Sequence, residues 1–253
     1  MNRTVVTLFS LVMLAGALPA SARILKTRPN PGAAPRTLPL TVGSGFEYDS
    51  DSEQSELGLP FLLEYSPLAR LTLAIEPSYA SIHTKAGGAL SGFGDLETSA
   101  TFGLLSERRN RPETAVITTV KWPTAANREL GTGYADYTVG ALVSKSYVQA
   151  DVELSVSYTL TGHPAGMRAA NSHEVSLAIE RDLTPKLDLI GEVLTGGGGA
   201  FGASTPGGRE SEGTLGLAYQ LSERLNLEQG VVMKSDGTWQ LVFAWQWEFG
   251  DTR

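Results

Sequence analysis

Apolar and polar side chains alternate over unusually long stretches of this chain, and this pattern restricts the fold more than any other feature. In the clearest stretch, apolar residues occupy every second position from Val148 to Leu160, while polar residues such as Gln149, Glu153 and Ser157 lie between them. Successive side chains of a strand point to opposite faces, so the stretch predicts a strand with one apolar and one polar face. Apolar spacing at helical period is hard to find, and we therefore expect an all-β protein.

The alternation recurs to the end of the chain. In the last stretch Trp239, Trp245 and Trp247 belong to one strongly aromatic face, which is not left in water. We expect twelve strands, at residues 38 to 48, 56 to 65, 70 to 81, 93 to 104, 114 to 122, 134 to 145, 148 to 160, 173 to 182, 187 to 195, 212 to 221, 225 to 234 and 238 to 249.

The length and the charge of these stretches favour a membrane barrel. Most have about 9 to 12 residues, as a tilted strand needs to cross a bilayer, whereas strands of soluble proteins usually have about 5 to 6. A charge at the lipid midplane costs roughly 2 to 4 kcal/mol, and the only charges on the twelve apolar faces are Lys145 and Arg181, at strand ends. The prediction is a transmembrane antiparallel up-and-down β-barrel of about twelve strands; the alternative is a soluble sandwich with these faces as its core.

Loop lengths agree with a barrel of the outer membrane, in which short turns lie on one rim and long loops on the other. Connections after every second strand are mostly tight, and the intervening ones are mostly longer. The tight ones include 66 to 69, 184 to 186 and 222 to 224, and the longer ones are 82 to 92, 123 to 133, 161 to 172 and 196 to 211. Two connections break the rule, because 105 to 113 is long and the Asp236-Gly237 hairpin is short.

The N-terminus is typical of an exported protein. A basic start, an apolar run from Val5 to Ala17 and the sequence Ala20-Ser-Ala22 predict a signal peptide over residues 1 to 22. Residues 23 to 37 are basic and rich in proline, which predicts a periplasmic tail rather than a strand; a plug for the lumen is the alternative. Residues 38 to 253 would then form the barrel, in a bacterial outer membrane.

Composition excludes several classes of function. The chain has no cysteine, which removes disulfides, thiolate metal sites and cysteine nucleophiles. Its formal net charge of −7 argues against a nucleic-acid partner, because phosphates call for a basic surface. Beyond the signal peptide, no run approaches the roughly 18 apolar residues of a membrane helix.

If the apolar faces contact lipid, the polar faces line the lumen, and these faces are rich in carboxylates. Rings of carboxylates favour cations in pores, although the same groups can simply hydrate the interior and pair with neighbours. The lumen-lining candidates are Glu64, Glu76, Glu97, Lys121, Glu153, Glu174, Glu192, Glu212, Glu228 and Lys234. The same face also carries Asp151, Glu180, Asp188, Glu248 and Arg70.

Catalytic and cofactor motifs are weak. The histidines, His83, His163 and His173, have no metal-ligand spacing, and there is no serine elbow. A triad built from His163 or His173 with Ser155 or Ser157 and a carboxylate is the remaining enzymatic alternative. The run Gly196 to Gly199 precedes no helix that could bind phosphate, so we interpret it as a loop. We expect no catalytic residues, no metal and no cofactor.

Three segments carry a family resemblance. They are Gly92-Phe-Gly-Asp95 with the strand that follows to Leu105, then Lys121-Trp-Pro-Thr124, and then Gly131-Thr-Gly133 leading to Asp136-Tyr137 and Leu142-Val-Ser-Lys145. Over roughly residues 90 to 160 the chain resembles the outer-membrane transporter family named for the MetA pathway of phenol degradation. The resemblance implies a barrel and uptake of small, often aromatic compounds, and it assigns no catalytic or binding residues.

We therefore predict an outer-membrane channel or transporter for passive passage of small molecules, including hydrophobic or aromatic compounds. The alternatives are a barrel enzyme acting on lipid and a structural or surface-binding barrel. Expected partners are outer-membrane lipid, the barrel assembly machinery and a small-molecule solute. One feature departs from other such barrels, which usually end on an aromatic residue, because Phe249 is followed by four further residues.

Overall fold

The computed structural model describes residues 37 to 251, apart from 52, 128, 164 to 170 and 199 to 208. The predicted signal peptide and all but the last residue of the predicted tail lie outside the described residues. In the described part, no helix is long and apolar enough to cross a membrane. The strands are β1 (Thr37–Ser50), β2 (Gln54–Leu68), β3 (Leu71–Glu76), β4 (Ser78–Thr84), β5 (Ala89–Phe93), β6 (Leu96–Leu105), β7 (Glu113–Trp122), β8 (Asp136–Ser146), β9 (Ala150–Leu160), β10 (Ser172–Thr184), β11 (Leu187–Gly198), β12 (Arg209–Ser222), β13 (Leu225–Lys234) and β14 (Trp239–Asp251).

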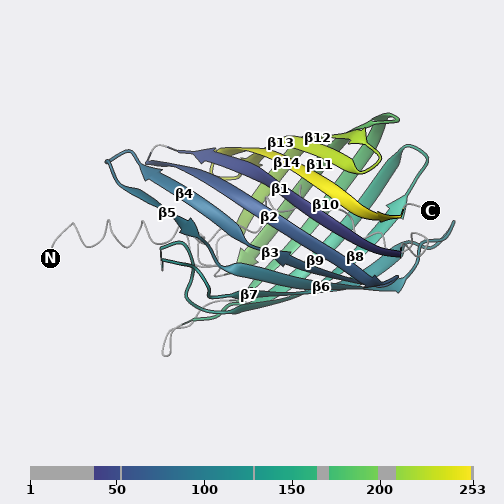
Figure 1. Ribbon diagram of the computed structural model, residues 1–253, viewed down its shortest axis with the longest axis horizontal. Coiled ribbons are helices and arrows are strands. Elements are labelled where there is room, and N and C mark those ends of the chain that lie inside the picture. Colours follow the sequence, from purple (N-terminus) through teal and green to yellow (C-terminus); the bar gives the residue numbers. More distant parts are fainter. Residues whose placement is uncertain (1–36, 52, 128, 164–170, 199–208, 252–253) are drawn as a thin grey trace.

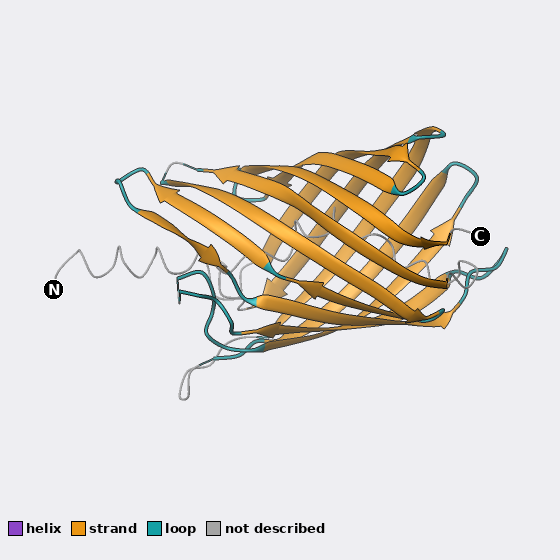
Figure 2. Ribbon diagram, viewed as in Figure 1, coloured by secondary structure: helices purple, strands orange, loops and turns teal. Residues whose placement is uncertain are grey.

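These strands form one antiparallel sheet that closes on itself. From β6 to β14 each strand pairs with the next one in the chain, β2 pairs with both β3 and β4, and β1 pairs with both β2 and β14. Figure 1 shows the resulting barrel, with tilted strands around a central axis, and Figure 2 shows that its wall consists of strands joined by loops and turns. Closure removes the free sheet edges that lipid would leave unsatisfied. The predicted barrel fold is therefore confirmed.

Two barrel strands are each interrupted once. β3 and β4 both pair with β2 and are separated only by Pro77, which has no N–H to donate to the ladder. The next crossing consists of β5, which pairs with β4, and β6, which pairs with β3. Gly94 and Asp95 separate β5 from β6. Counted as continuous crossings of the wall, the fourteen segments make twelve strands, as predicted.

The outer surface of the wall is apolar. Large apolar side chains stand outward at every second position, and many are about half exposed in the isolated chain, such as Leu177 at 45% and Val193 at 62%. The side chains between them point into the barrel, because adjacent strand residues face opposite ways. An exposed apolar belt of this extent is what a lipid environment covers.

Several predicted connections are shorter than expected. β4 continues to Thr84 and β5 begins at Ala89, so the loop predicted at 82 to 92 is a tight turn with Gly87 at a φ of +97°. Gly196, Gly197 and Gly198 are not a loop but the end of β11, where they pair with β10. Glycines satisfy the ladder through their backbone alone, so side-chain patterns do not reveal such a strand. β1 also begins one residue earlier than predicted, at Thr37, and β14 continues past Phe249 to Asp251, which lies opposite Thr37.

Candidate functional site

The inner wall of the barrel is the candidate site. The ten predicted lumen-lining residues all occupy positions that alternate with exposed apolar residues, so their side chains lie on the inner face. Glu64, for example, lies between Leu63 and Tyr65, both of which are at least 40% exposed on the outside. That these ten residues line a path for solutes remains a prediction.

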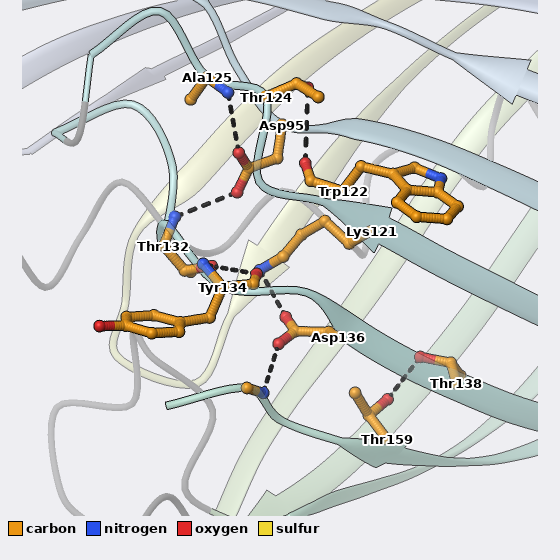
Figure 3. Close-up of polar contacts among 11 residues, drawn as sticks. Asp95, Lys121, Trp122, Thr124, Ala125, Thr132, Tyr134, Asp136, Thr138 and Thr159 are labelled. Atoms are coloured by element: carbon orange, nitrogen blue, oxygen red, sulfur yellow. Dashed lines mark hydrogen bonds and ion pairs between the residues drawn. The ribbon is translucent and has the colours of Figure 1, made fainter. Parts of the chain in front are cut away.

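One group of inner charges lies near the rim that carries the longer connections 123 to 135 and 161 to 171, called here the long-loop rim. Glu76, Glu97, Lys121 and Asp136 stand opposite one another on the successive strands β3, β6, β7 and β8. Lys121 forms an ion pair with Asp136, and both side chains are largely buried (Figure 3). A cation beside these carboxylates offsets the repulsion that opposed like charges would otherwise produce.

A second group of charges lies at the same rim on the other side of the barrel. Lys234, the last residue of β13, reaches across β14 to Asp49 on β1 at 2.7 Å. The Gln240 amide donates to Glu47 at 3.2 Å, and Glu47 is only 3% exposed. β7 and β13 are half-way around the ring of twelve strands from each other. The entrance to the lumen is therefore flanked by two charged groups, each centred on one lysine and dominated by carboxylates.

Carboxylates also face each other near the opposite rim, which carries the turns 69 to 70, 147 to 149, 185 to 186 and 223 to 224 and is called here the short-turn rim. Asp151 lies opposite Glu180, and Asp182 lies opposite Asp188. The acidic character of the inner wall thus extends along the barrel. An inner wall of this charge attracts cations and repels anions.

An apolar patch interrupts this polar lining. Val232, Val242 and Ala244 pack together on the inner face of β13 and β14, each at most 3% exposed. The patch was not predicted from the sequence, because the aromatic outer face of β14 dominates the pattern there. The sequence does contain a signal for it, because Val242 and Ala244 occupy the same alternating, inward-facing positions of β14 as Gln240 and Gln246. At this exposure the patch is packed within the wall and is not an accessible part of the lumen surface.

The connection between β7 and β8, residues 123 to 135, is called here the mouth loop, and it folds over the inner side of the wall. Leu130 is 5% exposed and packs against Ala80 and Ile82 of β4. Tyr79 and His83 continue the outward-facing positions of β3, so Ala80 and Ile82, which alternate with them, point inward. The mouth loop therefore lies on the lumen side of β4 and β5. Gly92 permits this approach, because a Cβ there would lie 2.9 Å from Cδ1 of Leu130.

One carboxylate fastens both ends of the mouth loop. Asp95, at the break between β5 and β6, accepts hydrogen bonds from the backbone N–H of Ala125 at 3.0 Å and of Thr132 at 3.1 Å (Figure 3). Asp95 is 9% exposed, and a Cβ on Gly131 would lie 2.5 Å from its Oδ1. Bonds from amides to a carboxylate are stronger than neutral ones, about 1.5 to 3 kcal/mol each. Sequence analysis did not identify Asp95 as a functional residue.

The neighbouring connection is tied to the same corner. The second carboxylate oxygen of Asp136 contacts Lys121, and its Oδ1 accepts a hydrogen bond from the N–H of Gly162 at 2.8 Å. A Cβ on Gly162 would lie 2.3 Å from the carbonyl oxygen of Ala135, so only glycine allows this approach. The three segments that carry the family resemblance therefore meet at one corner of the mouth.

The structure does not assemble the triad considered with His173. His173 is exposed on the outer face of β10, whereas Ser155 and Ser157 lie on the inner face of β9. Ser155 instead exchanges a hydrogen bond of 2.7 Å with Ser176. His83 belongs to β4, not to a loop, and His163 lies in the connection after β9. Within the described ranges, no three His, Asp or Glu residues are grouped so that they could hold a metal ion.

Comparison with known proteins supports the fold. No protein-family model matches the sequence, and no curated protein matches it. An outer membrane channel from Pseudomonas putida F1 is similar in structure, with a TM-score of 0.68, 16% identity and coverage of 88% of this chain and 100% of that one. The NanC porin gives a TM-score of 0.56 at 9% identity, covering 82% of this chain and 98% of that one. The KdgM porin in complex with disordered oligogalacturonate gives 0.53 at 8% identity, covering 82% and 99%.

Proposed function

We propose that this protein is an outer-membrane channel for passive passage of small molecules. The observation that carries the proposal is the division of the closed wall into an apolar outer belt and a charged inner face. Only a barrel with lipid outside and water or solute inside requires both surfaces at once. The structural likeness to channels and porins supports the same function.

The inner wall further suggests which solutes pass. Its carboxylates outnumber its lysines in both charged groups at the long-loop rim, so a polyanion such as the oligogalacturonate bound by the KdgM porin would be repelled. We propose small neutral or cationic organic molecules as solutes, including aromatic ones, as the resemblance to the MetA-pathway family implies.

The test is an electrical measurement in planar bilayers that separate two KCl concentrations. We expect step-like conductance with a reversal potential of the sign that indicates cation preference. The double variant Glu76→Gln with Glu97→Gln should lower this preference. The double variant Glu53→Gln with Glu223→Gln removes the same charge from exposed turns and should leave it unchanged. A folded barrel that conducts neither ions nor solutes in liposome swelling would contradict the proposed function.

The proposal includes location and orientation. Residues 1 to 22 would be removed on export, and the long-loop rim would face the outside of the cell. Sequencing of the mature N-terminus tests the first point. For the second, an epitope tag inserted at 161 to 163 should be labelled on intact cells, whereas one at 185 to 186 should not. Labelling of the short turn alone would reverse the orientation.

A further inference from the structure

Asp95 is placed where one side chain controls the shape of the lumen entrance. Its carboxylate accepts the N–H of Ala125 near the start of the mouth loop and the N–H of Thr132 near its end. The segment between them is thereby held closed on the lumen side of β4 and β5, with Leu130 as its apolar anchor. Figure 3 shows the carboxylate between the two arms of the loop.

The surroundings of Asp95 leave little freedom for this arrangement. Gly131 touches the carboxylate so closely that a Cβ would lie within 2.5 Å of both Asp95 Oδ1 and the Cβ of Ala125. The N–H of Leu96, the next residue, is bonded to the Thr124 hydroxyl at 2.9 Å, and the N–H of Ala126 is bonded to the carbonyl of Phe93 at 3.0 Å. The break between β5 and β6 and the mouth loop therefore form one unit, and Asp95 joins its two arms.

We infer that Asp95 is a positioning residue that sets the width of the channel entrance by holding the mouth loop in place. The inference rests on the proposed function, because the width of the entrance can be measured by conductance only if solutes pass through the barrel. Without the Asp95 carboxylate, two partly buried N–H groups lose their acceptor, which favours conformations in which water reaches them and the loop leaves the wall. Conductance follows the narrowest part of a path, so it should rise when the loop is released.

The first test compares Asp95→Asn with wild type in single-channel recordings. We expect mean conductance to rise by roughly twofold, with added flicker, because the amide keeps the size of the side chain but turns a donor toward one of the two N–H groups. Gly131→Ala should act in the same direction, because its methyl group displaces the carboxylate. Asp236→Asn is the matched control, since Asp236 lies at the same rim and accepts its hydrogen bonds from Thr238, within its own turn, rather than from the mouth loop.

A reversible disulfide makes the test specific for the position of the mouth loop. The chain has no cysteine, and the side chain of Leu130 reaches the Cβ position of Gly92, so Gly92→Cys with Leu130→Cys should form a disulfide that holds the loop to the wall. In the Asp95→Asn background, oxidation should return conductance to the wild-type level and reduction should raise it again. Wild-type conductance in both Asp95→Asn and Gly131→Ala, in barrels that show normal heat-modifiable migration, would overturn the role of Asp95. Absence of conductance in every variant would instead contradict the channel itself.

Discussion

The arc of the wall from β7 to β14 and the corner formed by β3, β4, β5, β6 and the mouth loop follow different rules. In the arc each strand is continuous, with apolar residues outward along its length. In the corner two strands break, and beyond the breaks the pattern is inverted. There the inward residues Ala80, Ile82 and Leu90 are apolar, whereas the outward residues Ser81 and His83 are polar.

This difference shows that alternation reports the medium on each side of a strand, not only the strand itself. Where lipid lies outside, apolar residues point outward. At the end of the corner, the inner side packs against Leu130 and Ala125 and the outer side carries polar groups, as expected for a hairpin that rises above the bilayer. The position of Pro77 and Asp95 therefore marks the level at which the surroundings of these strands change.

The largest effect should come from placing a charge on the lipid side of the arc. Val156 is outward and 45% exposed, whereas Ser157 is inward and lies opposite Glu174. Val156→Arg should cost roughly 2 to 4 kcal/mol of folding free energy, and Ser157→Arg much less because its charge meets a carboxylate. The fraction folded into vesicles, read from heat-modifiable gel migration, measures both. Greater damage at position 157 would show that the facing is wrong.

In the corner, truncation of the anchor should open the mouth loop without unfolding the barrel. Leu130→Ala removes a buried side chain, which costs roughly 2 to 5 kcal/mol. We expect this cost to lower the stability of the closed loop and not that of the barrel. Hydrogen exchange at the Ala125 and Thr132 amides should accelerate, while exchange in β9 and β10 should not. Glu129→Ala, at the exposed neighbouring position, is the control. Equal acceleration throughout the barrel would mean that corner and arc unfold as one unit.

A smaller effect is expected where the arc joins the corner. Asp136→Asn weakens both the ion pair with Lys121 and the hydrogen bond from Gly162. We expect a loss of about 1 to 3 kcal/mol in the local stability of the two connected loops. With a trypsin site introduced by Thr161→Lys, cleavage at position 161 should be faster in the Asp136→Asn variant than in the protein that carries Thr161→Lys alone. Unchanged cleavage would indicate that the two loops are held independently of Asp136.

The smallest effect concerns an ion pair at the short-turn rim of the arc. The Lys145 ammonium group donates to Glu107, whose Oε1 also accepts the Ser146 N–H at 3.1 Å, and these bonds lower the pKa of the Glu107 carboxyl. A lowered pKa means that the stabilisation is present above the ordinary carboxyl pKa and is lost as the pH falls through the lowered value. Glu107→Gln should cost about 0.2 to 1 kcal/mol at pH 7 in urea unfolding. The difference from wild type should vanish in strong acid, and a difference that grew with acidity would contradict this assignment.

The arc was predictable from the sequence, and the corner was not. The stretch expected at 148 to 160 is β9, Ala150–Leu160, because lipid on one side and a polar lumen on the other impose a strict period of two. The loop predicted at 82 to 92 proved to be mostly strand, because above the breaks the pattern is inverted and weak. The role of Asp95 in holding the mouth loop could not be predicted, because its partners are backbone amides about thirty residues away in the sequence. Every residue type offers such an amide except proline, so no sequence pattern marks them.

The candidate site was predictable in its charge but not in its detail. Inner carboxylates such as Glu97 and Glu212 follow from the alternation alone. The contact of Lys234 with Asp49 joins residues 185 positions apart in the sequence, and it requires the barrel to be closed before the two can meet. The apolar patch at Val242 and Ala244 was overlooked because its residues resemble those of the outer face in type, so only their position distinguishes them.

The pairing of Thr37 with Asp251 places the last hydrogen bonds of the wall between the most distant parts of the described chain. All the other pairs join strands that are close in the sequence, so those contacts form locally and early. β1, in contrast, keeps an unpaired edge until β14 has been synthesised and reaches it. An open edge inside a bilayer costs several kcal/mol for each unsatisfied group. Insertion should therefore be a single late event for the whole chain, and products truncated before β14 should accumulate outside the membrane rather than as smaller barrels.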